Sequence, residues 1–340
     1  MAGFMGFEAI LNGDLQEGIK ICAGTGERHQ INGQNYFFSY INENNKLSAA
    51  ATRQFCEMHP VRKKHIEQLL ALQNGSVVEE EYLARFECLG LASEDGNLTA
   101  AGYFKLIEGL PLKEQVRLLK CKFLVSEFDG AIPTIKTEHY ITKKYENLGC
   151  WCRHDESGTI QHLIIFSLLS DVAHLKELLS SQPHVHENKF FEIAFNLHSF
   201  RSDIKNGEIQ FSHNERAALI SILRDMTPDK IRLGYERWEK VSNEARQFAH
   251  VPSADLEPAL RLFEALGVDR LVNLAIFRMD HHNEVWGWPD ILLINGGDID
   301  LIEVKKNDKL SYKQIRTFDA LGQHTRGIFR SISVERVVLR

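Results

Sequence analysis

The fold of this chain is decided by residues 288–305, which read WPDILLINGGDIDLIEVK. Residues 291–294 form an apolar run of strand length, and the Asn-Gly pair at 295–296 is typical of a tight turn between antiparallel strands. Residues 299–305 then read as the returning strand. The stretch therefore predicts a β-hairpin inside a buried sheet.

Three charged residues converge on this hairpin. Because side chains alternate along a strand, Glu303 and Lys305 lie on the same face, and the turn folds both back towards Asp290. Burying three charges for packing alone would be costly. Carboxylates are preferred Mg²⁺ ligands, a bound cation lowers the pKa of its water, and an adjacent ammonium stabilises developing negative charge. The pattern predicts a metal centre that hydrolyses phosphodiester bonds.

The segment after the hairpin is a basic helix. Ser311 and Gln314 have the spacing of a capping box, which predicts a helix from Ser311 to about Leu321. A last strand is expected at 335–340. Cations near the start of this helix can hold a DNA backbone; the candidates are Lys306, Lys309, Lys313 and Arg316.

Charge is unevenly distributed along the chain. The whole sequence has 40 Lys and Arg, 46 Asp and Glu, and a net charge of −6. Residues 305–340 contain nine Lys or Arg and three Asp or Glu, a net of +6, so the first 304 residues carry −12. A basic segment on an acidic protein favours a local anion-binding face.

Composition bounds the class of protein. At 340 residues the chain is long enough for two or three domains, and 44% hydrophobic residues are ordinary for a globular protein. No apolar run is long enough for a membrane span, and the start of the sequence, MAGFMGFEAI, has neither the basic region nor the cleavage site of a secretion signal. Six cysteines do not make a disulfide scaffold. We expect a cytoplasmic protein without membrane contact, nucleoid-associated if it is bacterial.

Residues 1–180 contain patterns that indicate structure but no specific function. Residues 1–50 have no assigned role, although 36–41 read as a strand. Residues 51–125 look like a winged-helix module, with an Asp-Gly turn before LTAAG as the wing. An acidic candidate recognition helix (Glu79, Glu80, Glu81, Glu87) argues against insertion into a DNA groove. Residues 126–180 are expected to be a helical connector.

At the C-terminal hairpin the sequence resembles a known family. Residues 287–318, GWPDILLINGGDIDLIEVKKNDKLSYKQIRTF, resemble the virus-type replication-repair nuclease (VRR-NUC) domain of the PD-(D/E)xK superfamily. Within it, the sequence is most similar to the Fanconi-associated nuclease family, in which a G-x-P-D strand, an E-V-K strand, a D-x-L-S turn and a helical glutamine recur. The resemblance implies an α/β nuclease domain at 181–340 with a central mixed sheet and a helical insertion at about 205–280, preceded by an α-rich N-terminal region.

The resemblance also implies roles for individual residues. Asp290 and Glu303 would bind Mg²⁺ or Mn²⁺ with the Val304 carbonyl, Lys305 would be the catalytic lysine, and Gln314 the supporting glutamine. The family has a further catalytic glutamate upstream, in a helix that begins His-Glu-Gly. Here His186-Glu187-Asn188 is the nearest match, which makes Glu187 the choice for catalysis and metal binding; Glu192 and Glu257 stay open as alternatives.

The predicted function is metal-dependent hydrolysis of DNA, endonucleolytic or exonucleolytic, on flapped, branched or single-stranded ends in repair or recombination. Two alternatives stay open: a restriction or defence endonuclease that acts on foreign duplex DNA, and a DNA-binding protein with an inactive nuclease fold. Cys150, Cys152 and His154 suggest zinc only weakly, because a fourth ligand at a recognisable spacing is missing.

Overall fold

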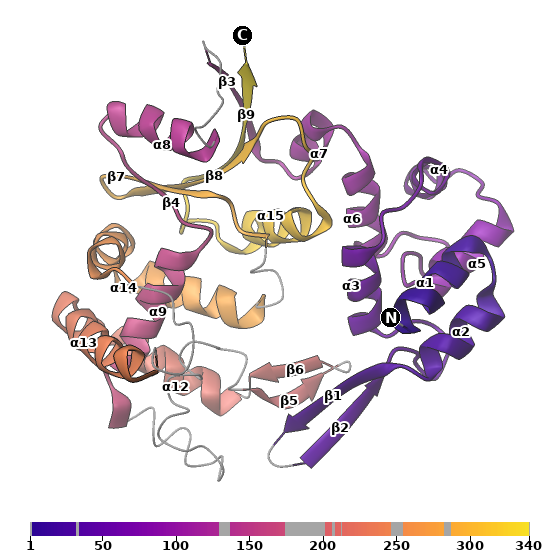
Figure 1. The fold of residues 1–340 in the computed structure, drawn as a ribbon, viewed down its shortest axis with the longest axis horizontal. Coiled ribbons are helices and arrows are strands. Elements are labelled where there is room, and N and C mark those ends of the chain that lie inside the picture. The colour runs from indigo at the N-terminus through magenta and orange to yellow at the C-terminus, as the bar shows by residue number, and fades with distance from the viewer. Residues whose placement is uncertain are drawn as a thin grey trace. The chain divides into compact units, whose positions relative to one another are not determined.

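In the computed structural model the chain forms two compact units (Figure 1). The N-terminal unit contains Met1–Leu118, Asp203–Ile209 and Lys309–Arg316. The sheet unit contains Leu119–Ser202, Gln210–Asp308 and Thr317–Arg340. The residues whose structure is described are 2–31, 34–128, 137–173, 201–205, 208–211, 213–245, 254–281 and 287–339.

A five-stranded mixed sheet organises the sheet unit. Its strands lie in the order β3-β9-β8-β7-β4, with β3, β9 and β8 parallel to one another and β7 antiparallel to both neighbours. The strands are β3 (Lys122–Phe128), β4 (Trp151–His154), β7 (Ile291–Asn295), β8 (Asp298–Lys305) and β9 (Ser331–Leu339). The mixed α/β class and the central mixed sheet expected from the sequence are confirmed.

The predicted hairpin is β7–β8. Asn295 pairs with Asp298 across the turn, and Ile291 pairs with Ile302. Gly296 has a φ of 60°, a left-handed conformation that glycine adopts without steric cost. Both strands are buried along almost their whole length, as their apolar residues require.

Helices cover both faces of this sheet (Figure 1). On one face α8 (Thr137–Asn147) packs Ile141 against alternate residues of β7 and β8. On the other face, the alternate apolar residues of the hairpin pack against α9 (Gly158–Leu169), α14 (Leu256–Asp280) and the end of α15 (Tyr312–His324). These residues are Leu292, Ile294, Ile299 and Leu301. Because successive side chains of each strand point to opposite faces of the sheet, the same strand contributes to two separate hydrophobic cores.

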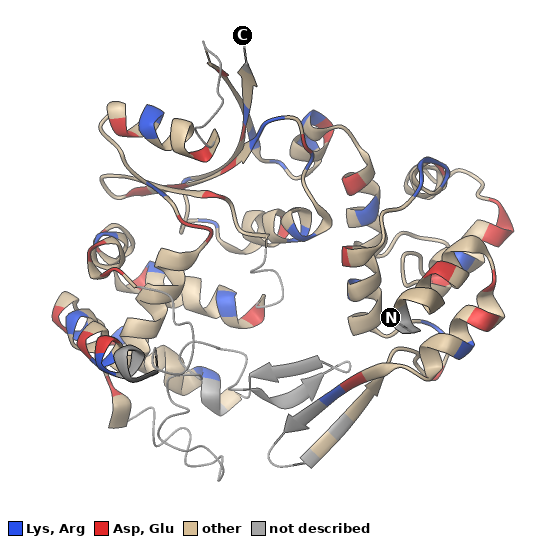
Figure 2. Ribbon diagram, viewed as in Figure 1, with Lys and Arg blue, Asp and Glu red and all other residues tan. Residues whose placement is uncertain are grey.

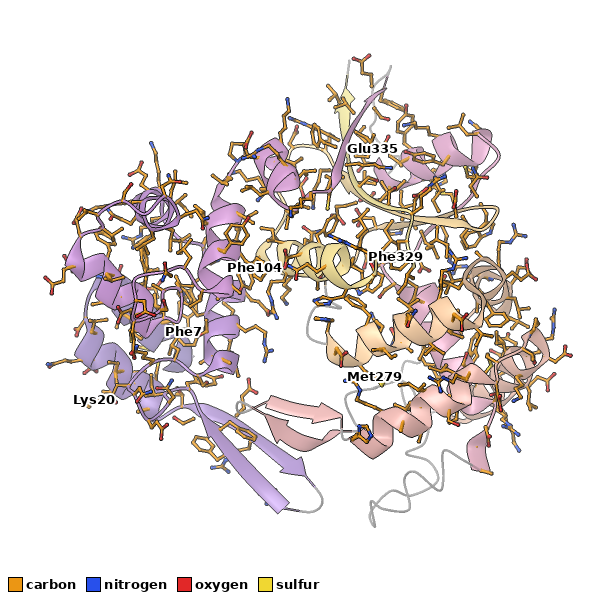
Figure 3. The ribbon with its side chains drawn as sticks, turned by 180° about the vertical axis from the view of Figure 1, so that it is seen from behind. Phe7, Lys20, Phe104, Met279, Phe329 and Glu335 are labelled. Carbon is orange, nitrogen blue, oxygen red and sulfur yellow. The ribbon has the colours of Figure 1, made fainter. Side chains whose placement is uncertain are left out.

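A buried polar cluster fixes α8 on the sheet. Glu335 of β9, labelled in Figure 3, is 0% exposed. Its carboxylate accepts hydrogen bonds from the Lys144 ammonium at 2.6 Å and the Tyr145 hydroxyl at 2.9 Å. The Ser126 hydroxyl of β3 also donates to Glu335. A buried carboxylate with three donors is satisfied, so this cluster is structural.

Two further helices, α12 (His213–Arg224) and α13 (Pro228–Ala245), share the core of α9 and α14. Gly267, with a φ of 66°, interrupts the helical conformation within α14. A separate two-stranded sheet is formed by β5 (Arg201–Lys205) and β6 (Glu208–Phe211).

Within the described residues of Met1–Leu118, the N-terminal unit is helical apart from one hairpin, β1 (Gly26–Ile31) with β2 (Gln34–Ser39). Its core includes Phe7, Phe55 and Phe86, all at most 1% exposed. The helices are α1 (Ala2–Asn12), α2 (Leu15–Ala23), α3 (Ala49–Met58), α4 (Lys63–Gln73), α5 (Glu80–Cys88), α6 (Ala100–Gly109) and α7 (Leu112–Leu118).

The predicted wing is a short turn in the structure. Ala92 and Leu98 form an isolated antiparallel bridge, and Gly96 between them has a φ of 71°. The preceding helix α5 begins with Glu80 and Glu81 in its first turn, and acidic residues are visible along it in Figure 2. Among the described residues, no helix combines the length and apolar character needed to span a membrane.

Candidate metal centre

Asp290 lies immediately before β7, at the entrance of the hairpin. The pairing of Ile291 with Ile302 places it beside Glu303, and its carboxylate Oδ2 accepts a hydrogen bond of 2.8 Å from the Val304 backbone N–H. The hairpin therefore brings Asp290 next to Glu303 near the end of β8, as the sequence predicts.

Glu303 and Lys305 meet on one face of β8, as strand alternation predicts. The Lys305 ammonium lies 3.0 Å from Glu303 Oε1 and 3.0 Å from Asp308 Oδ2. Glu303 is 1% exposed and Lys305 6%, whereas Asp308 is an exposed residue of the loop that follows. Lys305 is thus held between one buried and one exposed carboxylate.

Burial and crowding of carboxylates perturb this group. Burial and the neighbouring Asp290 carboxylate raise the pKa of Glu303 to about 8, although Lys305 opposes the shift. Burial also raises the pKa of Asp290, partly offset by the Val304 N–H. Burial lowers the pKa of Lys305, but Glu303 and Asp308 raise it by more, so the net shift is upward. A divalent cation would favour the charged form of both carboxylates.

A second set of ligand-type side chains surrounds Asp290. Ligand atoms of His154, Glu156 and Asp290 all lie within 4.8 Å of one another. His154 ends β4, and the backbone N–H of Asp155 donates to the Asp290 carbonyl at 2.8 Å. Two segments far apart in the sequence are therefore joined through Asp290, and a carboxylate and imidazole site for a metal ion is available here.

The turn after β4 explains how Glu156 reaches this position. Glu156 and Ser157 both have positive φ, 42° and 73°, which non-glycine residues adopt rarely and at a cost. Asp155 stabilises the turn, because its carboxylate accepts from the Thr159 N–H at the start of α9. Consecutive left-handed residues beside ligand-type side chains are typical of a functional site.

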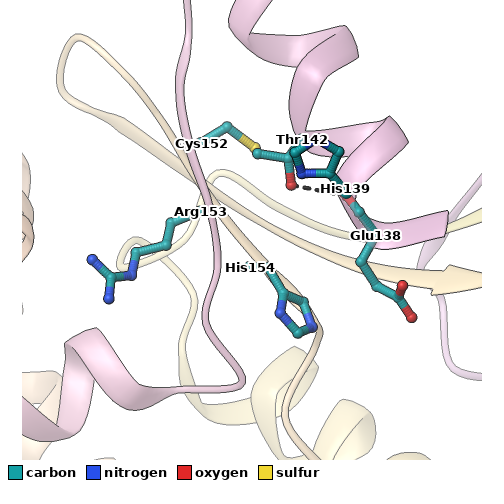
Figure 4. Close-up of a pocket in the computed structure, with 6 residues that line it drawn as sticks. All are labelled: Glu138, His139, Thr142, Cys152, Arg153 and His154. Carbon is teal, nitrogen blue, oxygen red and sulfur yellow. Dashed lines mark hydrogen bonds between the residues drawn. The ribbon is translucent and has the colours of Figure 1, made fainter. Parts of the chain in front are cut away.

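A pocket opens next to this group. It has a volume of about 360 Å³ and is lined by Glu138, His139, Thr142, Cys152, Arg153 and His154. Figure 4 shows Glu138 and His139 of α8 near His154, with Arg153 pointing away from them. Glu138 also acts on Asp290 electrostatically, since its charge contributes to the raised pKa of that carboxyl. The pocket gives solvent a route to His154.

Sequence reasoning did not assign His154 or Glu156 to the metal. It weighed His154 with two cysteines as a zinc site, and it sought the upstream glutamate near His186. The choice Glu187 and its competitor Glu192 lie outside the described residues. Glu257 is 72% exposed and is paired with Arg261 at 3.2 Å. The signal that could have found Glu156 is His-x-Glu directly before an apolar helix.

The predicted glutamine and three of the four predicted cations, all but Lys306, lie in the segment Lys309–Arg316, which belongs to the N-terminal unit. Gln314 Oε1 accepts from the Ser311 N–H at 3.0 Å, and Ser311 Oγ accepts from the Gln314 N–H at 3.4 Å, so the predicted capping box is confirmed. The Lys309 ammonium donates to the Gly109 carbonyl at 3.0 Å. The catalytic role of Gln314 stays a prediction.

Two other predicted DNA contacts are paired with one carboxylate. Glu57 of α3 lies 3.3 Å from the Lys313 ammonium and 3.7 Å from the Arg316 guanidinium. Lys306 is exposed at the end of β8. The segment is therefore basic, but the charges of Lys313 and Arg316 are already paired with a carboxylate of the protein.

Comparisons with known proteins give distant structural neighbours. No protein-family model matches the chain, and no curated protein sequence matches it. The crystal structure of paFAN1 bound to DNA with a two-nucleotide 5′ flap and a gap is similar at 17% identity and a TM-score of 0.46, over 86% of this chain and 51% of that chain. The paFAN1 complex with a one-nucleotide 5′ flap gives 15% identity and 0.45, over 96% and 54%. This chain thus spans about half the length of either neighbour.

Proposed function

We propose that this chain is a divalent-cation-dependent nuclease that hydrolyses phosphodiester bonds in DNA, acting on flapped, branched or single-stranded ends. The observation that carries the proposal is the meeting of Asp290, Glu303 and Lys305 at the end of one hairpin, with His154 and Glu156 beside them. Perturbed pKa values cluster at functional sites, and here burial raises the pKa of both the Asp290 and the Glu303 carboxyl.

The residues present fit a metal ion. Asp290 and Glu156 are oxygen donors, His154 is a nitrogen donor, and the buried Glu303 carboxylate is next to Asp290. The Val304 carbonyl is the further ligand that the family resemblance implies. When bound, Mg²⁺ or Mn²⁺ supplies Lewis-acid chemistry and lowers the pKa of a water.

Lys305 is the residue assigned to charge stabilisation. Its ammonium is fixed by Glu303 and Asp308 at 3.0 Å each, so little reorganisation is needed when negative charge develops on the phosphate. Asp290 keeps one carboxylate oxygen on the Val304 N–H, which fixes its orientation towards the site. Lys306, Lys309, Lys313 and Arg316 are the proposed contacts to DNA phosphates.

The proposal is tested with a panel of end-labelled DNAs: duplex, single strand, 5′ flap, 3′ flap and four-way junction, each incubated with Mg²⁺, Mn²⁺ or EDTA. We expect cleavage of flapped or single-stranded ends that EDTA abolishes. Cutting of intact duplex at fixed sites would select a restriction enzyme instead. Binding without cleavage under every metal condition would mean an inactive nuclease fold.

Asp308 gives a first variant. Asp308→Asn removes one of the two carboxylates that hold the Lys305 ammonium. The asparagine side chain has the same length and can still form hydrogen bonds. We expect kcat to fall by about tenfold with little change in KM, because positioning groups around a catalytic residue typically contribute 10- to 100-fold. The measurement is steady-state cleavage of a flap substrate. An unchanged kcat would show that Glu303 alone positions Lys305.

Glu57 gives a second variant, directed at DNA binding. If Lys313 and Arg316 bind phosphates, the Glu57 carboxylate competes for both, so Glu57→Gln should tighten DNA binding by about 2- to 5-fold, the range of a partly exposed ion pair. The slope of log K against log salt should also steepen. Glu114→Gln, which removes a carboxylate paired with Arg117, is the control with the same change in net charge. Equal tightening in both variants would exclude a specific role for Glu57.

A further inference from the structure

We infer that His154 makes the metal centre of the proposed nuclease a mixed nitrogen and oxygen site, which selects first-row transition ions over Mg²⁺ and Ca²⁺. The inference rests on the proposed function, because the same centre is involved, but it concerns which ion the centre takes. It assigns to His154 a role that the hairpin residues cannot supply, since those residues offer only oxygen and a cation.

The position of His154 is fixed by the backbone. His154 pairs with Ile291, and the next residue donates its N–H to the Asp290 carbonyl at 2.8 Å. A backbone contact of 3.5 Å also joins the Glu156 N–H to that carbonyl. The end of β4 and the entrance of β7 are therefore attached to each other, so the spacing of the three ligand-type side chains follows from the sheet register.

The side chains around this point are accessible and close. His154 Nε2 lies 3.8 Å from Glu156 Oε1, and the two side chains are 43% and 70% exposed. An ion pair this exposed contributes little to stability, so it does not explain a turn with two consecutive positive φ values. Ligand atoms within 4.8 Å of one another can close around one ion with small side-chain rotations.

Ligand chemistry then determines which ions are favoured. Mg²⁺ and Ca²⁺ bind almost entirely through oxygen, whereas imidazole nitrogen suits transition ions, with affinity rising from Mn²⁺ through Co²⁺ to Ni²⁺. One imidazole beside two carboxylates is intermediate between these classes. Removing the imidazole should therefore cost least for Mg²⁺, somewhat more for Mn²⁺, and most for Ni²⁺.

The test measures binding of the metals alone to the full chain by isothermal titration calorimetry, with Mg²⁺, Mn²⁺, Co²⁺ and Ni²⁺. The variant is His154→Gln, which places an amide oxygen where the ring nitrogen was. The matched control is His139→Gln, because His139 lines the same pocket but is outside the group of ligand atoms. Circular dichroism spectra of both variants establish that the fold is kept.

We expect His154→Gln to weaken Ni²⁺ and Co²⁺ binding at least about tenfold, Mn²⁺ binding about threefold, and Mg²⁺ binding hardly at all, with His139→Gln unchanged throughout. Equal losses for all four ions, or equal effects of the two variants, would overturn the inference while leaving the nuclease proposal intact. Failure of the unaltered chain to bind any divalent ion would overturn both. Cleavage of DNA by the unaltered chain in Mg²⁺ or Mn²⁺ distinguishes the two claims, because the nuclease proposal requires such cleavage and the inference about ion preference does not.

Discussion

Asp290→Asn is expected to reduce DNA cleavage by at least about 10³-fold, which corresponds to about 4 kcal/mol of lost transition-state stabilisation. Asparagine keeps the size of the side chain, and its carbonyl oxygen can still accept the hydrogen bond from the Val304 N–H. The fold of the hairpin should therefore survive. What the variant loses is the negative charge beside both Glu303 and His154, and with it the ligand that the two groups of candidate metal ligands share.

The measurement is single-turnover cleavage of a flap substrate at saturating Mn²⁺, together with calorimetric titration of the metal. DNA affinity in the absence of metal should be unchanged or higher, because one negative charge near the phosphate is gone. Asp298→Asn is the matched control, since Asp298 is in the same hairpin but is 55% exposed and paired with Arg330 at 2.9 Å. Full activity of Asp290→Asn would refute the proposed centre.

The hairpin and the helix after it could be predicted from sequence because their determinants are local. The turn at Gly296 and the alternation of Glu303 with Lys305 depend on a few consecutive residues. The capping box of Ser311 and Gln314 depends on a spacing of three. The start of the last strand was predicted less accurately. This strand begins at Ser331 rather than 335, because its pairing with β8 starts at Asp300.

The other half of the site could not be predicted, because it depends on the pairing of distant segments. β4 is only four residues long, and WCRH has no clear alternation of apolar and polar residues. Nothing in that sequence shows that it pairs with β7, from which it is separated by α9, α12, α13 and α14. Residues 122–128 likewise lack a pattern that predicts a strand, although β3 forms an edge of the same sheet.

The same limitation applies to the basic segment. Lys313 and Arg316 were identified by charge alone, which cannot show that α3 provides Glu57 as their partner. Leu310 is also held by a distant residue, since Gln115 accepts from its N–H at 2.9 Å and donates to its carbonyl at 3.2 Å. Pairwise contacts between elements that are far apart in sequence decide whether a cation is available to a ligand.

Gly234→Ala is expected to destabilise the sheet unit, against the usual effect of this substitution. In a helix interior alanine is favoured over glycine by about 1 kcal/mol. Gly234, however, is in α13 where a Cβ would lie 1.8 Å from the Phe166 carbonyl oxygen and 2.7 Å from its carbonyl carbon. Backbone atoms cannot rotate away, so α13 must move off α9, and the packing of Phe166 against Trp238 and Tyr235 is lost.

Overpacking of this kind costs about 1–3 kcal/mol and more when backbone must shift, so the net change should be at least about 2 kcal/mol. The segments of the N-terminal unit contain no tryptophan in their sequence, so tryptophan fluorescence follows the unfolding of the sheet unit selectively. We expect the midpoint temperature of that transition to fall by about 4–8 °C. Gly322→Ala, in α15, is the control, because the nearest atom to its added Cβ is the Leu119 oxygen at 3.9 Å. It should raise the midpoint slightly, so a common sign for the two variants would contradict the close approach of α13 and α9 at Gly234.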